Sequence, residues 1–236
     1  MLDSEILSRV DHTLLKMTAS WEEIKTLCDE AVRFKTASVC IPPSYVKPVF
    51  KEFGKELTVC TVIGFPLGYT YLPVKAVEAV HALEYGATEI DMVINAGDVK
   101  NGNYDLVLDE IKSIKKVCGQ KILKVIVETC YLNEEEKVRL CGVVTDAGAD
   151  FIKTSTGFGS AGATIADVKL FRRSVGPGVK VKAAGGIKTR EDLEAFIQAG
   201  ADRIGTSSAV KLLSGGLASG DAASGDAASG DAAAGY

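Results

Sequence analysis

Short apolar runs alternate with amphipathic segments along most of the chain. Several runs are rich in valine and isoleucine and are short enough to be buried strands. The sequence contains eight such runs, at residues 10–15, 36–41, 57–63, 88–95, 122–128, 150–154, 179–184 and 202–206. Between them, the amphipathic segments predict helices.

The predicted helices carry recognisable start and stop signals. Ser20 is followed three residues later by Glu23, which is a capping-box pattern. Asn133 precedes a run of acidic residues, and such residues suit the positive end of a helix. Thr189 is a further candidate N-cap, and Gly200 is placed to end the helix that follows it.

Eight strands that alternate with helices predict a parallel sheet, because each crossover returns the chain to the same end of the sheet. We expect an α/β fold, a single-domain TIM (β/α)8 barrel over residues 1–213. An open doubly wound sheet is the alternative. No G-x-G-x-x-G follows the first run, so a dinucleotide-binding fold has little support.

The composition changes at about Ser214. Residues 214–236 are low in complexity and repeat Asp-Ala-Ala-Ser-Gly, and no large apolar side chain occurs from 218 until Tyr236. Such a segment cannot bury a core, so we expect a disordered C-terminal tail. A natural tail and an artificial linker both fit this pattern.

Composition and charge exclude several classes of function. The chain of 236 residues has a formal net charge of -4, which argues against a nucleic-acid partner and against a polybasic membrane anchor. No apolar run reaches the length of a membrane span. With six cysteines but no C-x-x-C pair, and only His12 and His81, a zinc site has poor support. We therefore expect buried free thiols and a cytoplasmic protein.

The stretch "DFIKTSTGFGS" places Lys153 where an apolar strand meets a polar loop. A lysine is rarely buried unless it is paired or used, and active sites of TIM barrels lie at the carboxyl ends of the strands. Lys182 stands at the matching level of the next strand. Repulsion and desolvation predict that at least one of the two pKa values falls well below about 10.4. A neutral lysine is a nucleophile that can form a Schiff base with a carbonyl.

Other ionisable residues lie inside the predicted strands. Asp11, Asp91 and Lys124 would be costly there unless they pair or do chemistry. For Asp11 and Lys124 an internal salt-bridge network is as good an interpretation as a catalytic role. For the two lysines we expect little structural gain from neighbouring like charges. Lys180 shares the face of Lys182, but it is nearer the start of its strand and is expected to be solvated.

The segments "AAGGIKT" and "GTSSAV" follow the last two predicted strands. In TIM barrels these loops often bind phosphate through backbone N–H groups. Gly185 and Gly186 allow close approach of the backbone, and Gly205, Ser207 and Ser208 could act in the same way. Glycine pairs are common in plain turns, so it is the position beside Lys153 that makes these loops candidates.

The motifs "IGFPLG", "EIDMVIN", "FIKTSTGFGSAGAT", "VKAAGGIKT" and "RIGTSS" together resemble the deoxyribose-phosphate aldolase family of the bacterial type, over roughly residues 5–213. The resemblance implies a class I aldolase on a TIM barrel, with no metal and no organic cofactor. The implied reaction is the reversible cleavage of the phosphosugar 2-deoxy-D-ribose 5-phosphate to acetaldehyde and D-glyceraldehyde 3-phosphate. Homodimers are common among such relatives, although the sequence shows no interface.

By this resemblance Lys153 forms the Schiff base, Lys182 keeps the pKa of Lys153 low, and Asp91 moves protons together with Lys182 and a water. The residues that match substrate-binding positions are Asp11, Thr13, Cys40, Thr156, Gly157, Gly185, Gly186, Lys188, Ser207 and Ser208. Gly157 and the residues after it in this series match the phosphate side.

The terminal Tyr236 is a further catalytic candidate. A coil of about 20 residues spans roughly 25 Å on average, so the tail can reach the top of a barrel. A phenol can relay a proton between a substrate carbon and water. The competing interpretation is an inert chain end.

The sequence also departs from the family pattern. Tyr71 and Leu72 replace small or acidic residues after "GFPLG", and Pro73 follows them, where a first helical turn tolerates proline. Phe158 stands where some relatives have a lysine near the phosphate. The rival functions are another Schiff-base barrel enzyme, such as a transaldolase or a keto-acid aldolase, and a phosphosugar-binding protein without catalysis.

Overall fold

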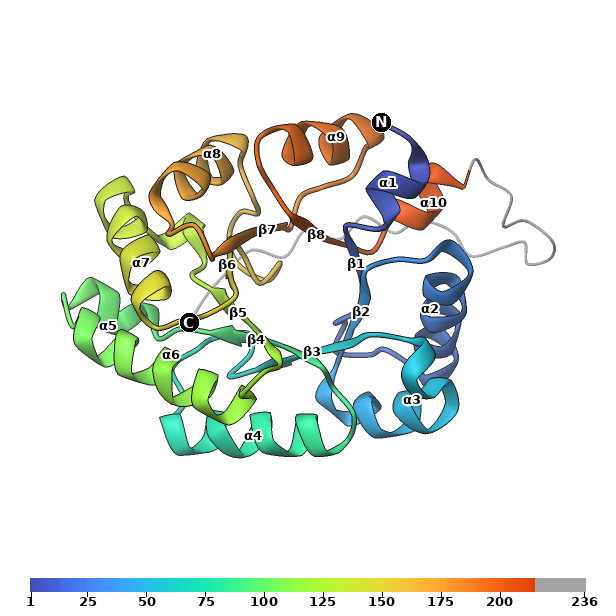
Figure 1. Cartoon of the computed structure of the whole chain (residues 1–236), viewed down its shortest axis with the longest axis horizontal. Coiled ribbons are helices and arrows are strands. Elements are labelled where there is room, and N and C mark those ends of the chain that lie inside the picture. Colours follow the sequence, from blue (N-terminus) through green and yellow to red (C-terminus); the bar gives the residue numbers. More distant parts are fainter. Residues whose placement is uncertain (215–236) are drawn as a thin grey trace.

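The computed structural model describes residues 1–214 and shows a closed barrel of eight parallel strands surrounded by helices (Figure 1). The strands follow one another around the barrel in sequence order, and the last pairs with the first. They are β1 (Val10–Thr13), β2 (Ser38–Ile41), β3 (Val59–Ile63), β4 (Glu89–Val93), β5 (Ile122–Ile126), β6 (Phe151–Lys153), β7 (Lys180–Ala184) and β8 (Arg203–Thr206). The predicted TIM barrel is confirmed, and each predicted run contains one strand.

Helices join the strands and cover the outside of the barrel (Figure 1). Their bounds are α1 (Asp3–Leu7), α2 (Trp21–Phe34), α3 (Val46–Phe53), α4 (Leu72–Glu84), α5 (Ala96–Lys100), α6 (Tyr104–Cys118), α7 (Glu134–Asp146), α8 (Ile165–Ser174), α9 (Arg190–Gln198) and α10 (Ala209–Leu213). Short 3-10 turns occupy Pro43–Tyr45, Gly54–Glu56 and Thr129–Tyr131.

The predicted helix starts are confirmed by their hydrogen bonds. Ser20, Asn133 and Thr189 each accept a hydrogen bond from the backbone three residues on, and the acidic residue there bonds back to the cap. These reciprocal bonds satisfy backbone N–H groups that have no partner inside the helix. Pro73 lies in the first turn of α4, as expected, because its missing N–H costs nothing there.

One continuous apolar layer lies between the strands and the helices. Alternate strand residues such as Val39, Ile90, Val125 and Val181 are fully buried in it, packed with apolar side chains of the helices. Their neighbours along each strand point into the barrel, because successive side chains of a strand face opposite sides. The inward set includes Asp91, and it is more polar than the outward set.

The strand register aligns the inward charged residues. Asp91 on β4 pairs with Lys124 on β5, and Lys153 on β6 pairs with Lys182 on β7. Residues that are 91 positions apart in the sequence are thereby brought into hydrogen-bond contact. The fold places these side chains near the carboxyl ends of the strands, where the sequence predicts the site.

Two expectations concern the end of the chain. The tail, apart from its first residue, lies outside the described residues, and so does Tyr236. The division into a domain of residues 1–213 and a tail of 214–236 therefore stays a prediction. Within the described part, no helix combines the length and the apolar character that crossing a membrane requires.

Candidate active site

A cavity of about 520 Å³ opens at the carboxyl ends of the strands. This volume suits a small organic molecule, since ligand pockets usually measure about 300–1,000 Å³. Residues at the ends of β1, β6, β7 and β8 and in the loops that follow line it. Among the predicted site residues, the cavity is lined by Thr13, Lys153, Thr156, Gly157, Gly185, Gly186, Lys188, Ser207 and Ser208.

Lys153 forms part of the cavity wall and has one carboxylate partner. It is the last residue of β6, it is 2 % exposed, and its Nζ donates a hydrogen bond to Asp91 Oδ2 at 2.8 Å. No other ion pair involves its amine within the part of the chain that the structure describes. Lys153 is thus the charged group of the barrel interior that a ligand in the cavity can meet directly.

Lys182 is fully buried, does not line the cavity and is held by two carboxylates. Its Nζ is 2.5 Å from Asp11 Oδ2 and 2.7 Å from Asp91 Oδ2. Burial opposes its charge, but Asp11 and then Asp91 outweigh burial and raise the pKa of Lys182 above its ordinary 10.5. The pKa of Lys182 is therefore not lowered. The expectation that the two lysines gain nothing structurally is wrong, because both bind the same oxygen of Asp91.

The remaining inward charges form the salt-bridge network that was one of two interpretations for Asp11 and Lys124. The Lys124 Nζ lies 2.8 Å from Asp91 Oδ1, 2.6 Å from Glu89 Oε2 and 3.5 Å from Asp11 Oδ2. Arg203 bonds to Asp11 and lies 2.8 Å from Glu89. The sequence reasoning missed Glu89 and Arg203, although both stand at the starts of predicted strands on the inward face.

The network leaves Asp91 strongly ionised. Burial alone would favour its neutral form, but Lys124, Lys153 and Lys182 outweigh burial and hold its pKa well below the ordinary 3.8. The pKa of Asp11 is also lowered, since Lys182 and Lys124 outweigh its burial. The pKa of Lys124 is raised well above 10.5 because Asp91 and its other anionic neighbours outweigh burial.

The buried charges do not balance. Four cationic groups, from Lys124, Lys153, Lys182 and Arg203, face three carboxylates, from Asp11, Glu89 and Asp91. An uncompensated charge in a low-dielectric interior is costly.

A second carboxylate shapes the loop after β6. Glu128 follows β5, is 6 % exposed and has a left-handed backbone with φ of 56°. Its Oε1 and Oε2 each lie 3.2 Å from the backbone nitrogen of Thr156, and Oε2 also accepts from the Thr156 hydroxyl. These bonds hold Thr156 in its position in the cavity wall. The signal for Glu128 in the sequence is an acidic residue at the end of an apolar run, at the level where active sites of barrels lie.

The loops after β7 and β8 form another part of the cavity wall. Gly185 and Gly186 have φ of 83° and 77°, a conformation that other residues rarely adopt. The Ser208 hydroxyl lies 3.0 Å from the Thr206 hydroxyl and 3.3 Å from the carbonyl oxygen of Ile187, which ties the two loops together. Ser207 and Lys188 are exposed to the solvent at this wall.

The remaining residues that the sequence singled out differ in position. Asp11 and Cys40 are fully buried beneath the cavity and do not line it. Phe158 lines the cavity and packs edge to face against Phe65, with ring centroids 5.3 Å apart. Lys180 is exposed, as expected.

The fold and the site together define a TIM-barrel protein with a lysine amine in the wall of a ligand-sized cavity, supported by a buried cluster of charges. Comparisons with known proteins narrow this class. Residues 6–223 match the description of the DeoC/LacD family aldolases. The chain therefore belongs to the DeoC/LacD family of aldolases.

Individual relatives agree with this assignment. The chain is 57% identical over 215 residues to a deoxyribose-phosphate aldolase of Clostridium botulinum (strain Alaska E43 / Type E3), which covers 91% of this chain and 97% of the relative. A solved structure described as "QR15, an Aldolase" superposes with a TM-score of 0.86 at 42% identity, covering 90% of this chain and 96% of that one. A tetrameric deoxyribose phosphate aldolase from Aeropyrum pernix superposes with a TM-score of 0.84 at 36% identity, covering 90% and 91%.

Proposed function

We propose that this protein reversibly cleaves 2-deoxy-D-ribose 5-phosphate to acetaldehyde and D-glyceraldehyde 3-phosphate, through a Schiff base on Lys153. The observation that carries the proposal is the position of Lys153, whose amine reaches the cavity while Lys124 and Lys182, the other two lysines of the charge cluster, are enclosed by carboxylates. A free amine at this point can attack a bound aldehyde.

The charge imbalance supports a free amine on Lys153. The excess of one cation would be relieved by one neutral lysine, and Lys153, which has the fewest carboxylate partners, loses least by being neutral. Lys182 keeps its proton and stands at the same level of the barrel, so its positive charge disfavours a second ammonium nearby. Lys182 thus acts as the fixed cation and Lys153 as the nucleophile.

The chemical steps then follow in order. Lys153 Nζ attacks the C1 aldehyde of the open-chain sugar, and loss of water gives an imine. Removal of the C3 hydroxyl proton lets the C2–C3 bond break, which releases D-glyceraldehyde 3-phosphate and leaves an enamine. Protonation of the enamine carbon and hydrolysis then release acetaldehyde and free the amine. The imine nitrogen accepts the electron pair of the broken bond, so no metal is needed.

Asp91 acts mainly by orienting the two lysine amines, and not by taking up protons itself. Because its pKa is held well below 3.8, its carboxylate stays ionised through the neutral pH range. It accepts hydrogen bonds from Lys153 and Lys182 at once, so it fixes the direction of both amines. A water beside Asp91 and Lys182 would then exchange the proton with substrate, with Lys182 as its donor partner.

The phosphate of the substrate would bind at the loops after β7 and β8. Gly185, Gly186, Ser207 and Ser208 offer backbone N–H groups and hydroxyls at that wall, and Lys188 offers a positive charge at the rim. Phe158 contributes no charge there, so the backbone carries more of this interaction than in relatives with a lysine at that position.

The proposal extends to the setting of the enzyme. We expect it to work in the cytoplasm and to form a homodimer, and sedimentation in solution tests the second point. Its relative from Aeropyrum pernix is described as tetrameric. Exposed apolar side chains of Tyr69, Tyr71, Val74 and Val77, at and before α4, mark a face on which a second copy could pack.

Tyr236 remains part of the proposal as a proton-transfer residue. Its phenol would exchange protons at the methyl carbon of the acetaldehyde imine. Deletion of Tyr236 should slow deuterium exchange into bound acetaldehyde by about 10²-fold, the lower range for a general acid–base group, and leave imine trapping intact. An unchanged exchange rate would assign Tyr236 to an inert chain end.

A substrate comparison tests the proposed function as a whole. The protein should cleave 2-deoxy-D-ribose 5-phosphate and should form a borohydride-stable adduct with acetaldehyde. Preference for a keto-acid or for transfer of a three-carbon ketone unit would favour the other Schiff-base aldolases. Binding of the phosphosugar without any adduct would mean a binding protein, and would refute the proposal.

A further inference from the structure

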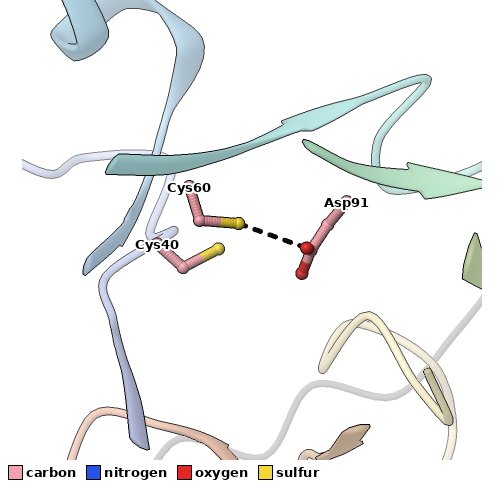
Figure 2. Close-up of side chains that lie close together, drawn as sticks. All are labelled: Cys40, Cys60 and Asp91. Carbon is pink, nitrogen blue, oxygen red and sulfur yellow. Dashed lines mark hydrogen bonds between the residues drawn. The ribbon is translucent and has the colours of Figure 1, made fainter. Parts of the chain in front are cut away.

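Two cysteines face each other inside the barrel, next to Asp91. Cys40 on β2 and Cys60 on β3 are in direct register, and both are fully buried (Figure 2). The Cys60 thiol donates a hydrogen bond to Asp91 Oδ1 at 3.1 Å. The two sulfurs and a carboxylate oxygen of Asp91 all lie within 4.8 Å of one another. The proposed aldolase steps make no use of Cys60.

Two sulfurs and one carboxylate oxygen are a donor set for a thiophilic cation. Thiolates select soft or borderline ions such as zinc, whereas calcium and magnesium prefer all-oxygen sites. Three protein ligands with a fourth position open are a known arrangement for zinc. Neither histidine of the described residues completes this set, because His12 bonds to Glu30 and His81 lies beside Glu84 on α4.

The distances fit a metal ion with a small adjustment. Zinc–sulfur bonds of about 2.3 Å and zinc–oxygen bonds of about 2.1 Å at a tetrahedral angle place sulfur and oxygen roughly 3.6 Å apart. The present contact between Cys60 Sγ and Asp91 Oδ1 is 3.1 Å and holds one thiol proton. A cation that replaces this proton would have to widen the contact by about half an ångström.

The nearby lysines do not exclude such an ion, because thiols release protons when they bind a metal. A divalent cation that displaces the protons of both Cys40 and Cys60 leaves the net charge of the interior unchanged. Two S–H bonds are replaced by two metal–sulfur bonds, and two protons leave to the solvent. A cation held without deprotonation would instead add two charges beside Lys124, which lies 3.1 Å from Cys60 Sγ.

The ion has a route from the top of the barrel. Val62 and the partly buried Leu15 and Phe65 pack against the two cysteines. These three side chains also line a second cavity, of about 280 Å³, beside the main one. A movement of Leu15 or Phe65 would therefore open the thiols to a small ion.

We propose that Cys40, Cys60 and Asp91 form a binding site for one thiophilic divalent cation, with zinc as the ion of first choice, and that its occupancy inhibits the enzyme. Asp91 Oδ1 now accepts from Lys124 and Oδ2 from Lys153 and Lys182. A bound ion would withdraw electron density from the Asp91 carboxylate and move it away from these amines. The hydrogen bond that orients Lys153 would then be lost. The inhibitory part rests on the proposed function, whereas the binding part does not.

The test measures binding before activity. Reduced protein is titrated with Zn²⁺ against a chromophoric chelator, and with Cd²⁺ while the thiolate-to-metal absorption in the ultraviolet is followed. We expect one equivalent bound and the absorption band.

Single-cysteine variants assign the site. Cys60→Ala should abolish binding, whereas Cys118→Ala, which removes a buried thiol of α6, and Cys130→Ala, which removes the most accessible thiol, should bind like the parent protein. Circular dichroism checks that each variant folds. Unchanged stoichiometry in Cys60→Ala, loss of binding in Cys130→Ala, or no absorption band would overturn the site.

Inhibition is read as the ratio of aldolase rates with and without Zn²⁺ within each variant. The parent protein and Cys118→Ala should lose activity at one equivalent, and the ratio for Cys60→Ala should stay near one. Stoichiometric binding with no loss of activity would overturn the inhibitory role alone. If the protein has no aldolase activity at all, the binding result still decides the site.

Discussion

The two faces of the same strands follow opposite rules. The outward face packs Val39, Ile90 and Val125 into one apolar layer under the helices. The inward face, one residue along each strand, carries Asp91 and Lys124, which are equally buried. Burial of the outward face is favourable in itself, at about 25 cal/mol for each Å² of apolar surface. Burial of the inward charges is costly and is offset only when each charge is paired.

This difference separates what holds the barrel together from what it does. The apolar layer needs residues of the right size, and many combinations satisfy that need. The interior needs particular charges at particular heights, because Asp91 must reach Lys124, Lys153 and Lys182 at the same time. Charges kept inside an otherwise apolar barrel at such cost are best explained by the chemistry of the cavity above them.

Two neighbouring substitutions on β4 should show the largest difference between the inward and outward faces. Asp91→Leu should lower the free energy of unfolding by about 3–5 kcal/mol, since it leaves the buried amines of Lys124, Lys153 and Lys182 without this partner. Met92→Leu, one residue along and equally buried on the outward face, should cost less than about 1.5 kcal/mol. Urea unfolding measures both values. Equal losses for the two variants would mean that the interior charges contribute nothing special.

Most of the fold could be predicted from the sequence, because it depends on local signals. The eight runs became eight strands, and the caps at Ser20, Asn133 and Thr189 form inside a single turn each. The position of Lys153 at the top of β6 was predicted on the same basis. Its place in the cavity wall followed from the barrel geometry.

The electrostatics of the site could not be predicted, because they depend on distant residues. The sequence shows Lys153 and Lys182 as neighbours but does not show that Asp91 lies between their amines. Repulsion between the two lysines is visible in the sequence without the shared anion, so the sequence does not predict the raised pKa of Lys182. Arg203 and Glu89 are 114 residues apart, and no local pattern indicates that they meet.

A negative charge in the loop after β8 should separate the binding of the phosphorylated sugar from that of the unphosphorylated one. Ser208→Asp places a carboxylate where the phosphate is proposed to bind. It should therefore weaken the binding of 2-deoxy-D-ribose 5-phosphate by about 1.5–3 kcal/mol, or roughly 10- to 150-fold. Turnover of unphosphorylated deoxyribose serves as the control and should change little. Steady-state kinetics with both sugars tests this, and equal losses would locate the phosphate site elsewhere.

Removal of the fixed cation should have the smallest effect. In Lys182→Leu the nearby positive charge is lost. Asp91 then interacts only with Lys153 and Lys124, so it attracts Lys153 more strongly. Both changes favour the ammonium form of Lys153, so the pH profile of imine formation should move upward by about one unit, or about 1.4 kcal/mol. Lys180→Leu, on the same strand but exposed, should leave the profile in place. An unmoved profile in Lys182→Leu would refute the role of its charge.

The identity of the covalent lysine tests the central claim most directly. The protein is incubated with acetaldehyde, reduced with borohydride, digested and examined by mass spectrometry. Lys153 should carry a two-carbon adduct in the parent protein, and Lys153→Ala should give no adduct and lose at least about 10⁴-fold in activity. An adduct on Lys182, or trapping that persists in Lys153→Ala, would contradict the assignment of the nucleophile.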